Sequence, residues 1–164
     1  MRFILMTFFF IFSLVFESTL FPHLTVAGVK PDFILVLVVF YAMLHGSREG
    51  AVIGLIGGLL QDLLIGQFIG LNALAMLLTG LFFGIMEYKV YKESIFIAAI
   101  TLAVGTFLHE TLVWFLGLLI GFSGNYFMAF KNVILPVVVY NSCLAPFLYG
   151  RFYRSSHNGL LKKP

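Results

Sequence analysis

The chain has 164 residues, of which 61% are hydrophobic and 10% are charged, and its formal net charge is +3 at pH 7. Soluble domains carry about 25% charged residues, so this composition excludes a soluble globular protein and indicates an integral membrane protein. The basic residues stand at the ends of apolar segments and form no stripe, which argues against nucleic-acid binding. The only cysteine, Cys143, lies in an apolar run, so a disulfide within the chain is excluded.

Six apolar segments predict an all-α membrane protein, a bundle of six transmembrane helices that forms a single membrane domain over residues 1–164. The first segment is long enough to cross a hydrocarbon core of about 30 Å. A cleaved signal peptide is the competing interpretation, but Glu17-Ser18-Thr19 supplies no small-x-small cleavage site. A loop is predicted over residues 121–132. The six predicted spans are about 3–21, 31–45, 50–65, 71–86, 94–120 and 133–150.

The distribution of lysine and arginine predicts the orientation of these spans. With the N-terminus in the cytoplasm, only Lys30 and Lys131 lie outside. Because cytoplasmic loops carry an excess of basic residues, this bias predicts that both termini are cytoplasmic. The eight basic residues placed inside are Arg2, Arg48, Lys89, Lys92, Arg151, Arg154, Lys162 and Lys163.

A glycine array runs from Gly46 to Gly70, where every fourth residue is glycine except Asp62. In a helix, residues four apart lie on one face, so Gly50, Gly54 and Gly58 form a stripe without side chains. Such a stripe admits the backbone of another helix, either from a partner protein or from a neighbour in the same bundle. Both uses are open at this point, and Asp62 ends the stripe with a carboxylate.

Four ionisable residues are expected at similar depth in the outer part of the membrane: Glu17, Asp62, His109 and Glu110. Ionisable groups within a span are costly and normally face the bundle interior or a partner. One interpretation is an outward-facing polar pocket or docking surface. The other is that these groups pair within the bundle, or are partly solvated, and set the helix register.

Enzyme signatures are weak in this sequence. His109-Glu110 begins like a zinc metalloprotease helix, but that motif needs a second histidine where Val113 stands. The four histidines are dispersed over different regions, and the spacing of four between glycines serves helix packing rather than phosphate binding. We therefore expect no catalytic residues, no metal and no cofactor.

The run from Pro31 to Gly84 resembles the family of the bacterial rod shape-determining protein MreD. The resemblance rests on the Pro31-Asp32 helix start, the Arg48-Glu49-Gly50 turn, the glycine helix that ends in Gln61-Asp62, and Gly70-Leu71-Asn72-Ala73. It implies a non-enzymatic, multi-pass protein of the bacterial cytoplasmic membrane that belongs to the cell-elongation machinery. The implied partners are MreC, the RodA glycosyltransferase with its penicillin-binding transpeptidase, and the MreB filament, directly or indirectly.

The resemblance also implies a fold similar to the substrate-binding S components of energy-coupling-factor vitamin transporters. Such a transporter component is the main alternative function, since it would hold a vitamin in the same outer pocket. Its docking face on the first helix is rich in alanine, whereas residues 3–21 contain none. We therefore favour a scaffold that binds MreC, with Gly54 and Gly58 allowing close approach and Asp62 supplying a polar contact.

Overall fold

In the computed structural model, residues 8, 10–13, 28–64, 68–86 and 95–158 are described. Phe8 and residues 10–13 are helical, and the rest of the first predicted span lies outside the described residues. The remaining elements are α2 (Phe33–His45), α3 (Ser47–Leu64), α4 (Leu71–Ile85), α5 (Ile95–Leu119), α6 (Tyr126–Ala129), η2 (Phe130–Ile134) and α7 (Leu135–Asn158).

The ends of α2 and α4 are set by capping and by a left-handed glycine. The α2 helix begins after Asp32, because the Asp32 Oδ1 atom accepts a hydrogen bond of 2.8 Å from the backbone N–H of Leu35. Gly46 separates α2 from α3 with φ of +96°, a value that glycine adopts without strain. Gly70 precedes α4 with φ of +104°.

The predicted loop over residues 121–132 is wrong from Tyr126 onward, because helical structure begins there. Asn125 caps this helix, and its Oδ1 atom accepts a hydrogen bond of 2.9 Å from the N–H of Phe127. A π-helical turn, η2, then joins α6 to α7, with the N–H of Leu135 bonded to the carbonyl of Phe130. Pro136 explains the wider turn, since its ring lacks an N–H and collides with the carbonyl four residues earlier.

Two helices in the described part of the chain are long and apolar enough to cross a membrane by length and composition, Phe96–Leu119 and Tyr126–Gly150. The apolar helices α2 and α4 are shorter, with 13 and 15 residues. A perpendicular span needs about 20 residues. Both helices are shorter than this. The place of α2 in the fold is therefore explained by its burial among the other helices rather than by its length.

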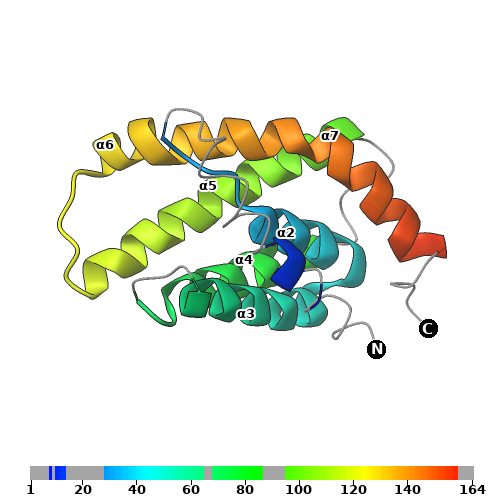
Figure 1. Ribbon diagram of the computed structural model, residues 1–164, viewed down its shortest axis with the longest axis horizontal. Helices are drawn as coiled ribbons and strands as arrows, with labels where there is room; N and C mark the ends of the chain where they lie inside the picture. Colours follow the sequence, from blue (N-terminus) through cyan, green and yellow to red (C-terminus); the bar gives the residue numbers. More distant parts are fainter. Residues whose placement is uncertain (1–7, 9, 14–27, 65–67, 87–94, 159–164) are drawn as a thin grey trace.

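The helix α2 is the centre of the fold. Figure 1 shows α5 beside α7 on one side of it and α3 beside α4 on the other, and α2 contacts all four. Every residue of α2 is buried except Phe33 and Leu37. A helix that is apolar on all faces is stable only where protein or lipid surrounds it, which explains why the most uniformly apolar segment lies inside.

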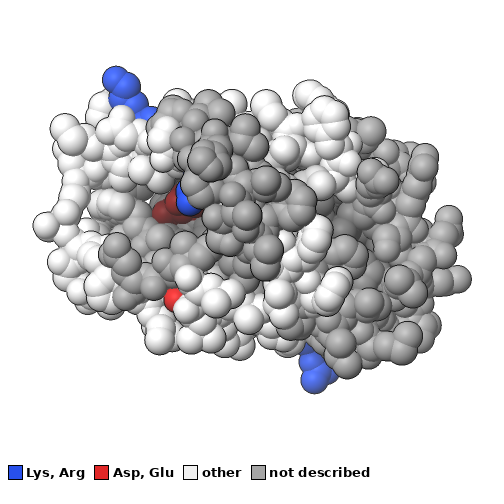
Figure 2. Space-filling view, in the orientation of Figure 1, with Lys and Arg blue, Asp and Glu red and all other residues white. Residues whose placement is uncertain are grey.

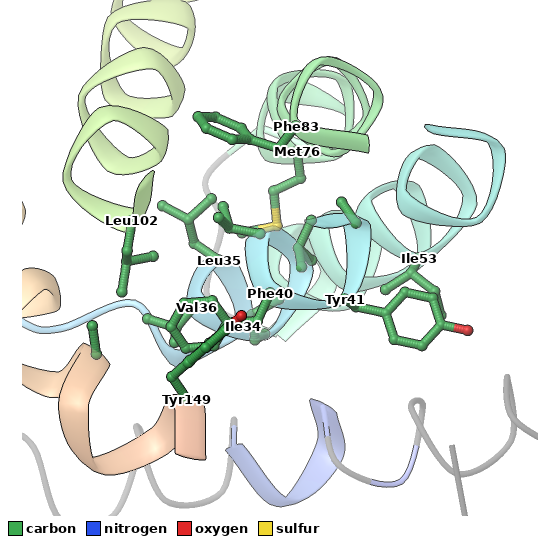
Figure 3. Packing of buried hydrophobic residues seen from close by; sticks show 14 of the residues in the cluster. Ile34, Leu35, Val36, Phe40, Tyr41, Ile53, Met76, Phe83, Leu102 and Tyr149 are labelled. Carbon is green, nitrogen blue, oxygen red and sulfur yellow. The ribbon is translucent and has the colours of Figure 1, made fainter. Parts of the chain in front are cut away.

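The core forms where α2 meets its neighbours. Figure 3 shows Leu35 of α2 on the side that carries Met76 and Phe83 of α4, and Tyr149 of α7 near Phe40. The rings of Phe40 and Tyr149 meet edge to face, with centroids 5.0 Å apart. This core fixes the N-terminal end of α2 against α3, α5 and α7, where most of the buried polar side chains lie.

Candidate functional site

The glycine stripe of α3 faces α4. A Cβ atom added to Gly58 would lie 2.5 Å from the Cα atom of Ala73, and one added to Gly50 would lie 2.6 Å from the carbonyl oxygen of Gly80. A Cβ atom on Gly54 would collide with the carbonyl group of Met76. The sequence left open whether the stripe receives a helix of a partner protein or a helix of the same bundle. In the structure it packs against α4 of the same chain. Gly50, Gly54 and Gly58 are covered by α4 and are not available to a partner in this structure.

The α4 helix has matching glycines on the face that meets α3. Gly80 lies against the backbone of Gly50, and Gly84 lies against the backbone of Ser47. Two helices that both have glycine at the contact carry no side chains there, so they can approach until their backbones touch. The pair α3 and α4 is thus a close-packed unit.

Asp62 caps the N-terminus of α4. Its Oδ2 atom accepts hydrogen bonds from the backbone N–H groups of Gly70 (2.8 Å) and Ala73 (3.1 Å). Its Oδ1 atom accepts from the backbone N–H and the side-chain amide of Asn72, at 3.2 and 3.0 Å. The first N–H groups of a helix have no partner within it, and the helix dipole favours an anion there. Asp62 is 1% exposed, and both of its carboxylate oxygens are therefore used in hydrogen bonds within the fold.

A second polar group, which we call the junction, joins α2, α3, α5 and α7. The backbone N–H of Asp32 donates to Asn141 Oδ1 at 3.1 Å, and Asn141 Nδ2 donates to Thr106 Oγ1 at 3.2 Å. Gln61 Nε2 donates to Asp32 Oδ2 at 3.2 Å. Sequence reasoning missed Asn141, Thr106 and Gln61 as members of one site. The sequence did contain a sign of these residues, because each is a polar residue within an apolar helix or at the end of one.

His109 and Glu110 of α5 adjoin the junction. His109 is 1% exposed, lies within electrostatic range of Asp32 and Asp62, and its Nδ1 atom has no hydrogen-bond partner among the described residues. Glu110 is partly buried and lies within electrostatic range of Asp32. Figure 2 shows acidic atoms on this face of the molecule, with a basic residue beside them.

Of the four ionisable residues expected at one depth, His109 lies within electrostatic range of Asp32 and Asp62, and Glu110 within range of Asp32. Glu17 lies outside the described residues. Asp62 has its hydrogen bonds within the fold, whereas His109 and Glu110 stand one helical turn after Thr106 of the junction on α5. The junction, rather than the glycine stripe, is the candidate site.

The opposite end of α2 holds a smaller polar group. The hydroxyl of Tyr41 donates to Glu49 Oε2 at 2.8 Å, and its ring stacks on the ring of His45 with centroids 4.1 Å apart. These contacts place Glu49 of α3 against α2 at the turn between the two helices. This group stabilises the turn, and the sequence analysis did not identify it.

A comparison with known families settles the class of this chain. The family model described as rod shape-determining protein MreD matches residues 1–154. The chain belongs to the MreD family. No curated protein and no solved structure matches it. The resemblance seen between Pro31 and Gly84 is confirmed and extends over most of the chain, and membership gives the protein a role in rod shape determination.

Proposed function

We propose that the chain is a non-enzymatic scaffold of the rod complex, which binds MreC and thereby controls cell shape and lateral peptidoglycan synthesis. RodA and its penicillin-binding transpeptidase join through this contact, and MreB joins directly or indirectly. The observation that carries the proposal is the match to the MreD family over residues 1–154. We further propose that the protein lies in the bacterial cytoplasmic membrane, with six helices, both termini in the cytoplasm and a fold similar to transporter S components.

Two structural features support a scaffold. The α3 and α4 helices are held at close distance by glycines on both faces, and Asp62 ties the start of α4 to the end of α3. A partner therefore meets a preformed surface, which lowers the entropy cost of binding. Large apolar side chains of α5 and α7, such as Phe115 and Phe147, are exposed and suit lipid or a partner's transmembrane helix.

We place the docking contact at Glu110, together with Glu17 of the first span, because His109 is 1% exposed and stays inside the bundle. An ionisable side chain inside a membrane protein normally faces a partner or the bundle interior. Asp62 is already occupied by α4, whereas no described residue donates a hydrogen bond to the Glu110 carboxylate. Glu110 is therefore the residue of this set best suited to an external contact.

The test is co-purification of MreC with the tagged, full-length protein from its native membrane. Glu110→Gln keeps the shape of the side chain and removes its charge, and Arg48→Gln at an exposed position in the first turn of α3 is the matched control. We expect stoichiometric MreC with the parent and with Arg48→Gln, and less MreC with Glu110→Gln at equal membrane level. Absence of MreC from the parent complex would refute the scaffold. Recovery of an ATPase pair and a bound vitamin would support a transporter component instead.

A further inference from the structure

The turn between α5 and α6 carries an uncharged, apolar surface at one end of the molecule (Figure 1). We call residues 117–128 the tip. None of these residues is charged, and six of them are large apolar side chains that are exposed. A cluster of exposed apolar side chains marks an interaction site. The six are Leu118, Leu119, Ile120, Phe122, Phe127 and Met128.

The tip is held in one shape by its own contacts. The α5 helix ends in a Schellman cap, in which the N–H of Phe122 donates to the carbonyl of Gly117 at 2.9 Å and Gly121 has a φ of +96°. The Phe122 ring lies over Gly117, where an added Cβ atom would be 2.6 Å from the ring. The ring of Tyr126 meets that of Trp114 with centroids 4.9 Å apart. The exposed side chains therefore stand on a preformed surface.

Two basic residues set the depth of the tip. Lys131 and Arg151 lie about 20 residues apart along η2 and α7, which corresponds to about 30 Å and so to the thickness of the hydrocarbon layer. Basic side chains at the ends of a span reach the headgroups. The exposed Lys131 therefore marks the outer boundary of the hydrocarbon in the proposed orientation. Tyr126 lies about 7 Å beyond it, and the headgroup layer is about 5–7 Å thick on each side.

Lipid tails do not reach the turn at this depth. Residues 122–125 have no regular secondary structure, and irregular backbone does not face lipid within the hydrocarbon because its N–H and C=O groups would lack partners. The exposed Asn132, next to Lys131, would also have to enter the hydrocarbon if the tip did. The apolar side chains of the tip thus face headgroups and water, and an apolar protein surface would remove them from the water.

We infer that the tip binds an apolar, uncharged segment of a membrane-anchored partner protein on the outer face of the membrane. A charged segment would lose its hydration at the tip without gaining an ion pair, because the tip carries no charge. The depth of the tip requires a segment directly outside the hydrocarbon, such as the chain next to a transmembrane span. This inference rests on the proposed function and extends the docking contact outward, since Glu110 lies about two helical turns before Gly117 on α5.

The test measures how fast a membrane-impermeant maleimide labels a cysteine in the tip of the full-length protein, in a Cys143→Ser background. Leu119→Cys and Phe127→Cys report on the apolar surface, since the two side chains are 71% and 70% exposed. Gly124→Cys in the same turn is the matched control, because a Cβ atom there meets nothing within 4 Å. Rates are compared between spheroplasts and lipid nanodiscs that hold one copy of the purified protein.

We expect both tip cysteines to react about tenfold more slowly in spheroplasts than in nanodiscs, the factor that burial of one large apolar side chain supplies. Purified full-length MreC should slow them in nanodiscs to the same extent, whereas Gly124→Cys keeps its rate. Slow labelling in nanodiscs without a partner assigns the cover to lipid. Slow labelling only where two copies share a nanodisc assigns it to a second copy, and fast labelling everywhere leaves the tip uncovered. Each of these three results would overturn the inference.

The proposed function fails by a different readout, the absence of MreC from the purified complex. If MreC co-purifies but does not slow the labelling of the tip, the scaffold stands and the inference is wrong. If MreC does not co-purify, equal rates in spheroplasts and nanodiscs refute the inference as well, and slower rates in spheroplasts support it with another partner.

Discussion

Replacing Gly58 by alanine should destabilise the fold through a single methyl group. The added Cβ atom would lie 2.5 Å from Ala73 Cα, 2.6 Å from Asn72 O and 2.7 Å from Ala73 N, all of them backbone atoms that cannot rotate away. Ordinary contacts between carbon atoms are about 3.5–4.0 Å, so α3 and α4 must separate by about 1 Å at this point. Overpacking of this kind costs about 1–3 kcal/mol.

The matched control for this experiment is Gly150→Ala in α7, where a Cβ atom meets nothing within 4 Å. Both substitutions gain the helix propensity of alanine over glycine, about 1 kcal/mol, so their difference isolates the contact with α4. For a chain of this size the difference corresponds to roughly 2–12 °C in Tm, measured by thermal unfolding in detergent. A Gly58→Ala protein that melts with Gly150→Ala would refute the close contact between α3 and α4.

Three further predictions concern the cap, the junction and the orientation. Asp62→Ala leaves the first N–H groups of α4 without their acceptor and should cost about 1–3 kcal/mol of stability, whereas Asp62→Asn, which keeps one oxygen, should cost less; equal Tm values would contradict the cap. Asn141→Leu should lower the Tm by removing the link between Asp32 and Thr106, while Asn132→Leu, at an exposed position, should not; no difference between the two would show that the junction contributes nothing to stability. In a Cys143→Ser background, a membrane-impermeant maleimide should label Gly124→Cys in spheroplasts and Arg48→Cys only after permeabilisation, and the reverse pattern would invert the proposed orientation.

The apolar segments allowed the helices α2 to α5 to be predicted from sequence within a few residues of their ends. This succeeded because helix boundaries depend on local chemistry, such as Asp32 at the start of α2 and the left-handed Gly70 before α4. The same local reasoning failed at residues 126–132. There Gly124, Asn125 and Lys131 indicated a loop, but Asn125 caps a helix and the π-helical turn continues it past Lys131.

The sequence by itself determined the class of protein, the glycine stripe and the carboxylate at its end, because composition and spacing along a helix are properties of the chain alone. Only the tertiary structure decided what the stripe and Asp62 contact. A stripe without side chains accepts any helix backbone, and a carboxylate accepts any donor, so neither pattern names its partner. In the folded protein, α4 packs against the glycine stripe and also donates hydrogen bonds to Asp62. It also gathers Asp32, Gln61, Asn141 and Thr106, distant in sequence, into one hydrogen-bonded group.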